Sequence, residues 1–281
     1  MTTLLLDNPI PGLNFRGFAV GNPTTHIQDD FYYGTWKTWA ARLLISRPTW
    51  RSIKAKCLNV STYLNPPQSC QDAINIASNE MGSWFNPYDL SHPMCVSEEN
   101  GSQSEAMFLM KHVSRALNIA LPPLRYLPCE DLFIASYLNR RDVQLALNVV
   151  PGQISGNWSD CVTDSRWNYD YNGFYISQLP VYQRVSQLPN FTTIVYSGTA
   201  DTIVPSLGAS RWIFNLFTDT PTEAWHAWNV TVGQAAGYTV AWNNFRFVTA
   251  SNCGHLLPWS CARQGLAIFQ RLVDGKSGNN Q

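Results

Sequence analysis

Apolar and polar positions in the last third of the chain predict two strands and two helices in alternation. TTIVYSG (192–198) and FRFVTA (245–250) are short runs rich in β-branched and aromatic residues, which is typical of buried strands. SLGASRWIFNLF (206–217) and CARQGLAIFQRLVDG (261–275) repeat their apolar residues every three or four positions, as amphipathic helices do. This order predicts parallel strands joined by crossover helices.

The part of the chain before this strand–helix alternation has a different pattern of apolar and polar residues. FRGFAVGNPT predicts a short buried strand that ends at the turn Gly21-Asn22-Pro23. From about 27 to 150, helical spacing recurs in the residues around the breaker Pro48, in SCQDAINIASNEM and in RRDVQLALNV, while SEENGSQ (97–103) indicates an exposed loop. The expected organisation is therefore a core strand at 1–26, an inserted helical cap at 27–157, and the C-terminal part of the core at 158–281.

Composition limits the class of protein. The 281 residues are 45% hydrophobic, enough for one large α/β domain or two small ones. Nineteen basic and nineteen acidic residues leave no net charge and form no block of like charge, so a nucleic-acid partner is not expected. No apolar run reaches the roughly 18 residues of a membrane span, and Leu4–Leu6 is too short for the core of a signal peptide.

Sequons and cysteines indicate the secretory pathway. Five sites fit the N-glycosylation pattern: Asn59, Asn100, Asn157, Asn190 and Asn229. The seven cysteines include no C-x-x-C pair, which favours disulfides over a zinc site and leaves at least one cysteine unpaired. His92-Pro-Met-Cys95 has no second half at ligand spacing, so neither a metal nor another cofactor is expected. Sequons without an entry signal predict that the beginning of the protein is missing.

Two candidate catalytic residues follow the two predicted C-terminal strands. Asp201 lies three positions after Gly198, and His255 follows the strand at 245–250. Taken alone, Asp201 is an ordinary turn residue and His255 an ordinary satisfied polar residue. If the strands are neighbours, however, the two side chains meet at one edge of the sheet. Their order, acid and then histidine, is that of the α/β-hydrolase triad.

Five blocks of the chain resemble the serine carboxypeptidases in order and spacing, and together they cover nearly its whole length. The blocks are NFRGFAVGNPTTH, YLNRRDVQLALNV, WSDC, VYSGTADTIVP and NCGHLLPWSCARQGLAIFQRLVDGK. The resemblance implies a partial α/β-hydrolase fold: a mostly parallel sheet with flanking helices and an inserted helical cap. It also implies release of single residues from peptide C-termini at acidic pH, in vacuoles, lysosomes or outside the cell. Family members are often homodimers.

The resemblance also assigns individual residues. Asp201 matches the triad acid, His255 the triad histidine, and Leu256 a position that lines the pocket for the departing residue. It pairs Cys57 with Cys70 and Cys95 with Cys129, and it joins Cys161 to a cysteine outside this chain. Cys253 and Cys261 have no partner in this scheme and are expected to be free core thiols.

The chain departs from the family at the nucleophile. The family's G-E-S-Y-A-G elbow and its upstream oxyanion donors are absent, and the sequence contains no G-x-S-x-G at all. Ser155 and Ser197 stand in the wrong setting for an elbow, while Thr199 and Ala262 replace a usual aspartate and proline. Two classes remain open. One is part of a carboxypeptidase or related acyltransferase that also needs its N-terminal half. The other is a non-catalytic remnant that binds peptides or a partner. In either case the chain alone is expected to lack peptidase activity.

Overall fold

A computed structural model describes residues 1–58, 66–93, 130–149, 157–159, 173 and 175–274. The chain divides into two compact units, Met1–Ser91 with Phe174–Gln281, and His92–Gly173. The pair Cys95 and Cys129, the cysteine Cys161 and the loop SEENGSQ lie outside the described residues. The first unit carries the sheet and the candidate site.

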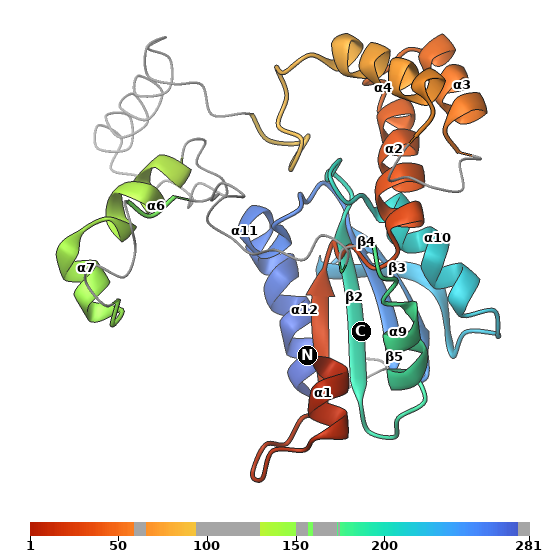
Figure 1. Cartoon of the computed structure of the whole chain (residues 1–281). Helices are drawn as coiled ribbons and strands as arrows, with labels where there is room; N and C mark the ends of the chain where they lie inside the picture. The colour runs from red at the N-terminus through yellow and green to blue at the C-terminus, as the bar shows by residue number, and fades with distance from the viewer. Residues whose placement is uncertain (59–65, 94–129, 150–156, 160–172, 174, 275–281) are drawn as a thin grey trace. The chain divides into compact units, whose positions relative to one another are not determined.

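Five strands form one mixed sheet in the order β1-β2-β5-β4-β3 (Figure 1). The first three run parallel, with Gly17 opposite Thr192 and Thr193 opposite Phe245. β3 and β4 form an antiparallel hairpin along the other side of β5. The bounds are β1 Gly17–Gly21, β2 Thr192–Gly198, β3 Glu223–Thr231, β4 Gln234–Trp242 and β5 Phe245–Ala250. The three parallel strands confirm the strands predicted from the sequence.

The hairpin is a correction to the predicted strand–helix alternation. Two further strands stand between the crossover helix and β5, so the return to the sheet is not a simple helix–strand unit. Gly233, at φ 79°, lies in the turn between β3 and β4, where a residue with a side chain would be strained. β3 is exposed along most of its length and carries alanine and asparagine. The apolar pattern of β3 is therefore weaker than the pattern of a buried strand.

Helices cover both faces of the sheet, which explains why the parallel strands are apolar without alternation. On one face, Val195 and Phe247 pack in a cluster with Trp212. On the other, Ile194 and Val248 pack with Ile268. The helices concerned are α9 Leu179–Val185 and α10 Ser206–Leu216 on the first face, and α11 Leu257–Ser260 and α12 Ala262–Asp274 on the second. Both long helices confirm their sequence predictions.

A helical layer after β1 has its own small core. It comprises the π-helix η1 Gln28–Thr35, α2 Trp36–Ala41, α3 Arg47–Lys56 and α4 Gln68–Met81. Trp36, Ile53 and Ala77 are among its buried residues. Pro48 lies in the first turn of α3, a position where a missing N–H costs nothing. The predicted Cys57–Cys70 disulfide is confirmed, and it joins the end of α3 to α4.

The remaining helices among the described residues are short. α1 spans Thr2–Asp7 in the first unit, and α6 Glu130–Leu138 and α7 Arg141–Ala146 belong to the second. Among the described helices, none combines the length and apolar character needed to cross a membrane. The boundaries predicted for the helical cap, 27–157, stay a prediction.

Asp30 is a fully buried residue of η1 whose carboxyl group contacts α10. Its Oδ2 accepts the backbone N–H groups of Thr25 (2.6 Å) and His26 (2.8 Å), and its Oδ1 accepts the indole N–H of Trp212 (3.1 Å). Burial raises the pKa of Asp30 from 3.8 to about 7, against these hydrogen bonds and with a further contribution from the neighbouring Asp29 charge.

We expect Asp30 to make the first unit more stable in acid. Because its folded-state pKa lies above the unfolded value, the folded chain holds a proton that the unfolded chain has released between about pH 4 and pH 7. The stabilisation is complete below that window and is lost as the pH rises through it, at about 1.4 kcal/mol per pH unit. Urea unfolding at pH 4 to 7.5 should show this slope in the difference between the parent chain and Asp30→Asn. Asp72→Asn, on the exposed surface of α4, serves as control, and a pH-independent difference for Asp30→Asn would contradict the expectation.

Candidate active site

The candidate site lies at the carboxyl ends of β2 and β5. These strands are parallel neighbours, so the turns that follow them meet at the same edge of the sheet. Asp201 is fully buried in the first turn, and the side chain of His255 in the second is 25% exposed. His255 Nδ1 lies 2.7 Å from Asp201 Oδ2. The structure therefore brings together the two residues that the sequence singled out.

The carboxylate of Asp201 is fixed by donors on both oxygens. Oδ1 accepts the backbone N–H groups of Ile203 (2.7 Å) and Val204 (3.2 Å) in its own turn. Oδ2 accepts the side-chain amide of Asn22 (2.6 Å) beside His255. A carboxylate held in this way cannot rotate, so it can orient an imidazole and stabilise its protonated form.

Asn22 is a site residue that the sequence reasoning did not identify. It directly follows β1, is 3% exposed and has a φ of 40°. Besides Asp201, its Nδ2 donates to Val204 O and Ser197 Oγ at 3.1 Å each, and its Oδ1 accepts the N–H of Gly198 at 3.0 Å. One side chain thus connects the end of β1 to the end of β2 and to the acid. The sequence feature that could have identified Asn22 is its place in a Gly-Asn-Pro turn at the end of a strand.

The segment 86–91 contacts the turns of both Asp201 and His255. These contacts were also not predicted from the sequence. Pro87 O accepts the N–H (3.0 Å) and hydroxyl (2.6 Å) of Thr202, beside the acid. Tyr88 O accepts the N–H of His255 at 2.7 Å, and the two rings lie 5.7 Å apart. The carboxyl group of Asp89, which is 3% exposed, occupies the space into which a side chain at Gly254 would project. The backbone of His255 is therefore positioned from a third part of the chain.

The serine nearest in sequence to the acid is not available as a nucleophile. Ser197 is fully buried, and its hydroxyl shares a 2.9 Å hydrogen bond with Ser206 Oγ while it accepts the amide of Asn22. This agrees with the sequence, in which Ser197 does not stand in a nucleophile elbow. Ser155 lies outside the described residues.

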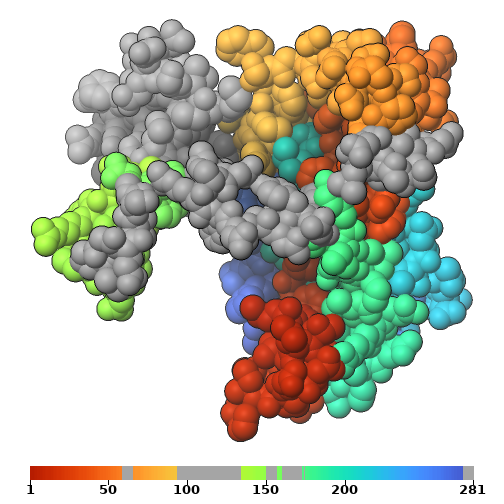
Figure 2. Space-filling view, in the orientation of Figure 1, coloured from red at the N-terminus to blue at the C-terminus, as the bar shows by residue number. Residues whose placement is uncertain are grey.

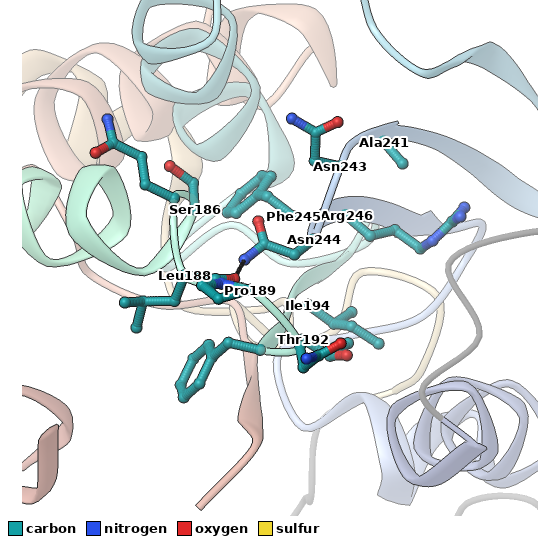
Figure 3. A pocket seen from close by; sticks show the side chains of 13 residues that line it. Ser186, Leu188, Pro189, Thr192, Ile194, Ala241, Asn243, Asn244, Phe245 and Arg246 are labelled. Carbon is teal, nitrogen blue, oxygen red and sulfur yellow. Dashed lines mark hydrogen bonds between the residues drawn. The ribbon is translucent and has the colours of Figure 1, made fainter.

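Two pockets among the described residues differ in their distance from the site. A cavity of about 260 Å³ lies beside the acid turn and is mostly apolar; it is lined by Phe31, Tyr32, Thr35, Trp36, Trp39, Met81, Phe85, Pro87, Thr202 and Ile203. The second, about 600 Å³, lies at the opposite ends of the strands, near Thr192 and Phe245 (Figure 3). There the side chain of Asn244 donates to Leu188 O at 2.9 Å. The larger pocket is therefore remote from Asp201 and His255.

Leu256, predicted to line a substrate pocket, is 57% exposed immediately after His255. Its role stays a prediction, as do the catalytic roles of Asp201 and His255. Within the described ranges, no group of three or more His, Cys, Asp or Glu side chains is placed to hold a metal ion.

The expectation that Cys253 and Cys261 are free thiols is wrong. The two form a disulfide, with their Cα atoms 5.7 Å apart. The short helix α11 lies between them and turns the chain back on itself, so residues eight positions apart meet. Pairing by family pattern could not find this bridge, because that pattern assigned neither residue a partner.

Comparison with known proteins decides the family. The family model described as serine carboxypeptidase matches residues 5–275. This chain belongs to the serine carboxypeptidase family. The resemblance seen in the sequence is thereby confirmed.

The chain is similar to several plant proteins and to a solved yeast structure. Serine carboxypeptidase-like 27 of Arabidopsis thaliana is 28% identical over 95% of this chain and 54% of its own length. P-(S)-hydroxymandelonitrile lyase of Sorghum bicolor is 30% identical over 96% of this chain and 51% of its own. Kex1(delta)p, a prohormone-processing carboxypeptidase from Saccharomyces cerevisiae, superposes with a TM-score of 0.63 at 14% identity, covering 100% of this chain and 60% of that one. The likeness confirms the α/β-hydrolase fold. The chain spans about half the length of the curated relatives it matches.

Proposed function

We propose that this chain supplies the acid and the histidine of a serine carboxypeptidase, an enzyme that releases C-terminal residues from peptides. The observation that carries the proposal is the 2.7 Å contact between Asp201 Oδ2 and His255 Nδ1 at the ends of two neighbouring parallel strands. Membership in the family supplies the reaction class. The arrangement needs neither a metal nor another cofactor.

In the proposed reaction His255 acts first as a base and then as an acid. Its Nε2 takes the proton of a serine hydroxyl while the serine oxygen attacks the peptide carbonyl, and it returns that proton to the nitrogen of the departing residue. Water then attacks the acyl-serine with the same nitrogen as base, which frees the shortened peptide. Asp201 keeps the imidazole in the tautomer with its proton on Nδ1 and stabilises the charged form.

We propose that the serine belongs to a further segment of the same protein. The sequence has no G-x-S-x-G, and the curated relatives are about twice as long. β1 forms one edge of the sheet, where another strand could pair. Near it, α1 lies on the visible surface (Figure 2), and large apolar residues on α1, after it and on α12 are exposed: Leu4, Ile10, Leu13, Leu266, Phe269 and Val273. A packed partner segment would bury them.

The pocket beside the acid turn supports an apolar preference near the cleaved bond. Its lining is aromatic and aliphatic apart from two threonines, and Ile203 lies two residues after Asp201. Its volume of about 260 Å³ suits one bulky side chain. We propose that peptides with an aromatic or aliphatic residue next to the cleaved bond are preferred over charged ones. Leu256, exposed beside His255, would contact the departing residue.

An acidic compartment of the secretory pathway fits the described chemistry. The Cys57–Cys70 and Cys253–Cys261 disulfides require an oxidising environment during folding. The sequon residues Asn157, Asn190 and Asn229 are exposed, as acceptors of glycans must be, whereas Asn59 and Asn100 lie outside the described residues. Asp30 favours the folded state in acid. We therefore propose a vacuolar, lysosomal or extracellular location; pairing of two copies stays an expectation from the family.

A fluorophosphonate probe, which labels activated serines, tests the proposed function. The 281-residue chain alone is expected not to label. A longer protein, in which the nucleophile-bearing half of a relative precedes this chain, is expected to label and to release C-terminal residues from peptides, as followed by mass spectrometry. His255→Ala should abolish both activities, while His226→Ala, an exposed histidine of β3, should leave them intact.

Each other outcome contradicts part of the proposal. Stoichiometric labelling of the short chain would show that the nucleophile has been misassigned. Failure of a folded longer protein to label would favour a non-catalytic remnant that binds peptides or a partner. Labelling without peptide cleavage would indicate another reaction of the same triad, such as acyl transfer to an alcohol or the cyanohydrin cleavage for which the Sorghum bicolor relative is named.

A further inference from the structure

The loop that carries His255 is closed by a covalent bond. Cys253 stands two residues before the histidine and Cys261 six residues after it, and their disulfide joins the two ends of this stretch. Between them lie Gly254, His255, Leu256 and the helix α11. The bridge therefore fixes the turn after β5 to the start of α12, with the histidine inside the closed loop.

The first sulfur is anchored in the core and beside the acid. Cys253 is fully buried, in a cluster with Ile194, Val248 and Leu257. Its carbonyl accepts the N–H of Ala200, the residue before Asp201, at 2.8 Å. Movement of Cys253 would therefore change the acid turn and the histidine loop together.

The second cysteine of the bridge lies closer to solvent. Cys261 is partly exposed at the point where α12 begins, and its carbonyl accepts the N–H of Gly265 at 2.9 Å. A 3.0 Å hydrogen bond from Gly254 N–H to Ser260 Oγ links the same two ends of the loop as the disulfide does. A single hydrogen bond contributes much less to loop closure than a covalent bridge.

We propose that the Cys253–Cys261 disulfide is a positioning element for His255, and that its reduction loosens the pairing of His255 with Asp201. The proposal rests on the proposed function for its catalytic meaning. A dithiol reduces the bridge in two steps: its thiolate attacks the accessible Cys261 sulfur and releases Cys253 as a thiolate that takes up a proton, and its second thiol then displaces Cys261. The chain gains two thiols, and the dithiol becomes a cyclic disulfide.

The chain contains a matched control for this bridge. Cys57 and Cys70 also close a short loop, but both are buried and belong to the helical layer formed by η1 and α2–α4. Limited dithiothreitol is therefore expected to reduce Cys253–Cys261 first, because attack needs access to a sulfur. Trapping with iodoacetamide and peptide mapping would show the order.

Amide hydrogen exchange in the 281-residue chain measures the positioning effect without any activity. Two amides report on it: that of His255, bonded to Tyr88 O, and that of Ala200, bonded to Cys253 O. In the double variant Cys253→Ala/Cys261→Ala we expect both to exchange about tenfold faster or more, while Val195 and Phe247 in the sheet keep their rates. Cys57→Ala/Cys70→Ala should leave all four unchanged.

Two results would overturn the proposal. One is unchanged exchange at His255 and Ala200; the other is equal acceleration throughout the sheet, which would show a general effect on stability. If the double variant does not fold, the same amides are measured in the parent chain with and without dithiothreitol. In a longer protein that carries the nucleophile, kcat should fall about 10- to 100-fold with KM little changed. If serine labelling fails while the exchange result holds, the proposed function fails and the positioning role of the bridge stands.

Discussion

Replacement of Asp201 by asparagine is expected to lower kcat about 10,000-fold in a protein that combines this chain with a nucleophile-bearing segment. The carboxylate now accepts four hydrogen bonds, two on each oxygen. An amide has a single acceptor oxygen. If that oxygen keeps the backbone N–H groups of Ile203 and Val204, the NH₂ group faces His255 Nδ1 and forces the imidazole proton onto the nitrogen that must accept one from serine.

The measurement is kcat for release of a C-terminal residue, with fluorophosphonate labelling as an independent readout. Asp72→Asn is the matched control, since it makes the same chemical change on the exposed surface of α4. Thermal unfolding of both variants separates loss of catalysis from loss of fold. Activity of Asp201→Asn within tenfold of the parent would exclude Asp201 as the orienting acid.

Replacement of Asn22 by alanine is expected to destabilise the first unit by about 4 kcal/mol, with a thermal midpoint about 10 °C lower. The change removes three donated hydrogen bonds and one accepted bond, and it leaves Gly198 N–H and Val204 O buried without this partner. Alanine is also strained at the φ of 40° that asparagine tolerates.

Asn22→Gly separates the two contributions, because glycine adopts this backbone conformation freely but makes no side-chain hydrogen bonds. Chemical denaturation of both variants should place Asn22→Gly between Asn22→Ala and the parent chain. If Asn22→Ala loses less than about 1 kcal/mol, the bonds seen at this side chain do not hold the ends of β1 and β2 together.

Local pattern determined a large part of this fold. β2, β5, α10 and α12 have apolar residues at strand or helix spacing and adopt the predicted structure. The order of Asp201 and His255 on successive parallel strands was enough to predict that they meet, and the five motif blocks were enough to identify the family. These features depend on residues close together in sequence or on order along the chain, which a sequence displays directly.

Tertiary contacts decided what the sequence did not display. Asn22 meets Asp201 across 179 positions, and the segment 86–91 meets His255 from a part of the chain expected to belong to the cap. The β3–β4 hairpin is mostly exposed on its outer strand and so lacks the apolar pattern of a buried one. The bridge between Cys253 and Cys261 depends on how α11 turns the chain. In each case two parts of the chain meet because of the path that the backbone takes in the folded structure. Neither the residue types nor their spacing in the sequence indicates that path.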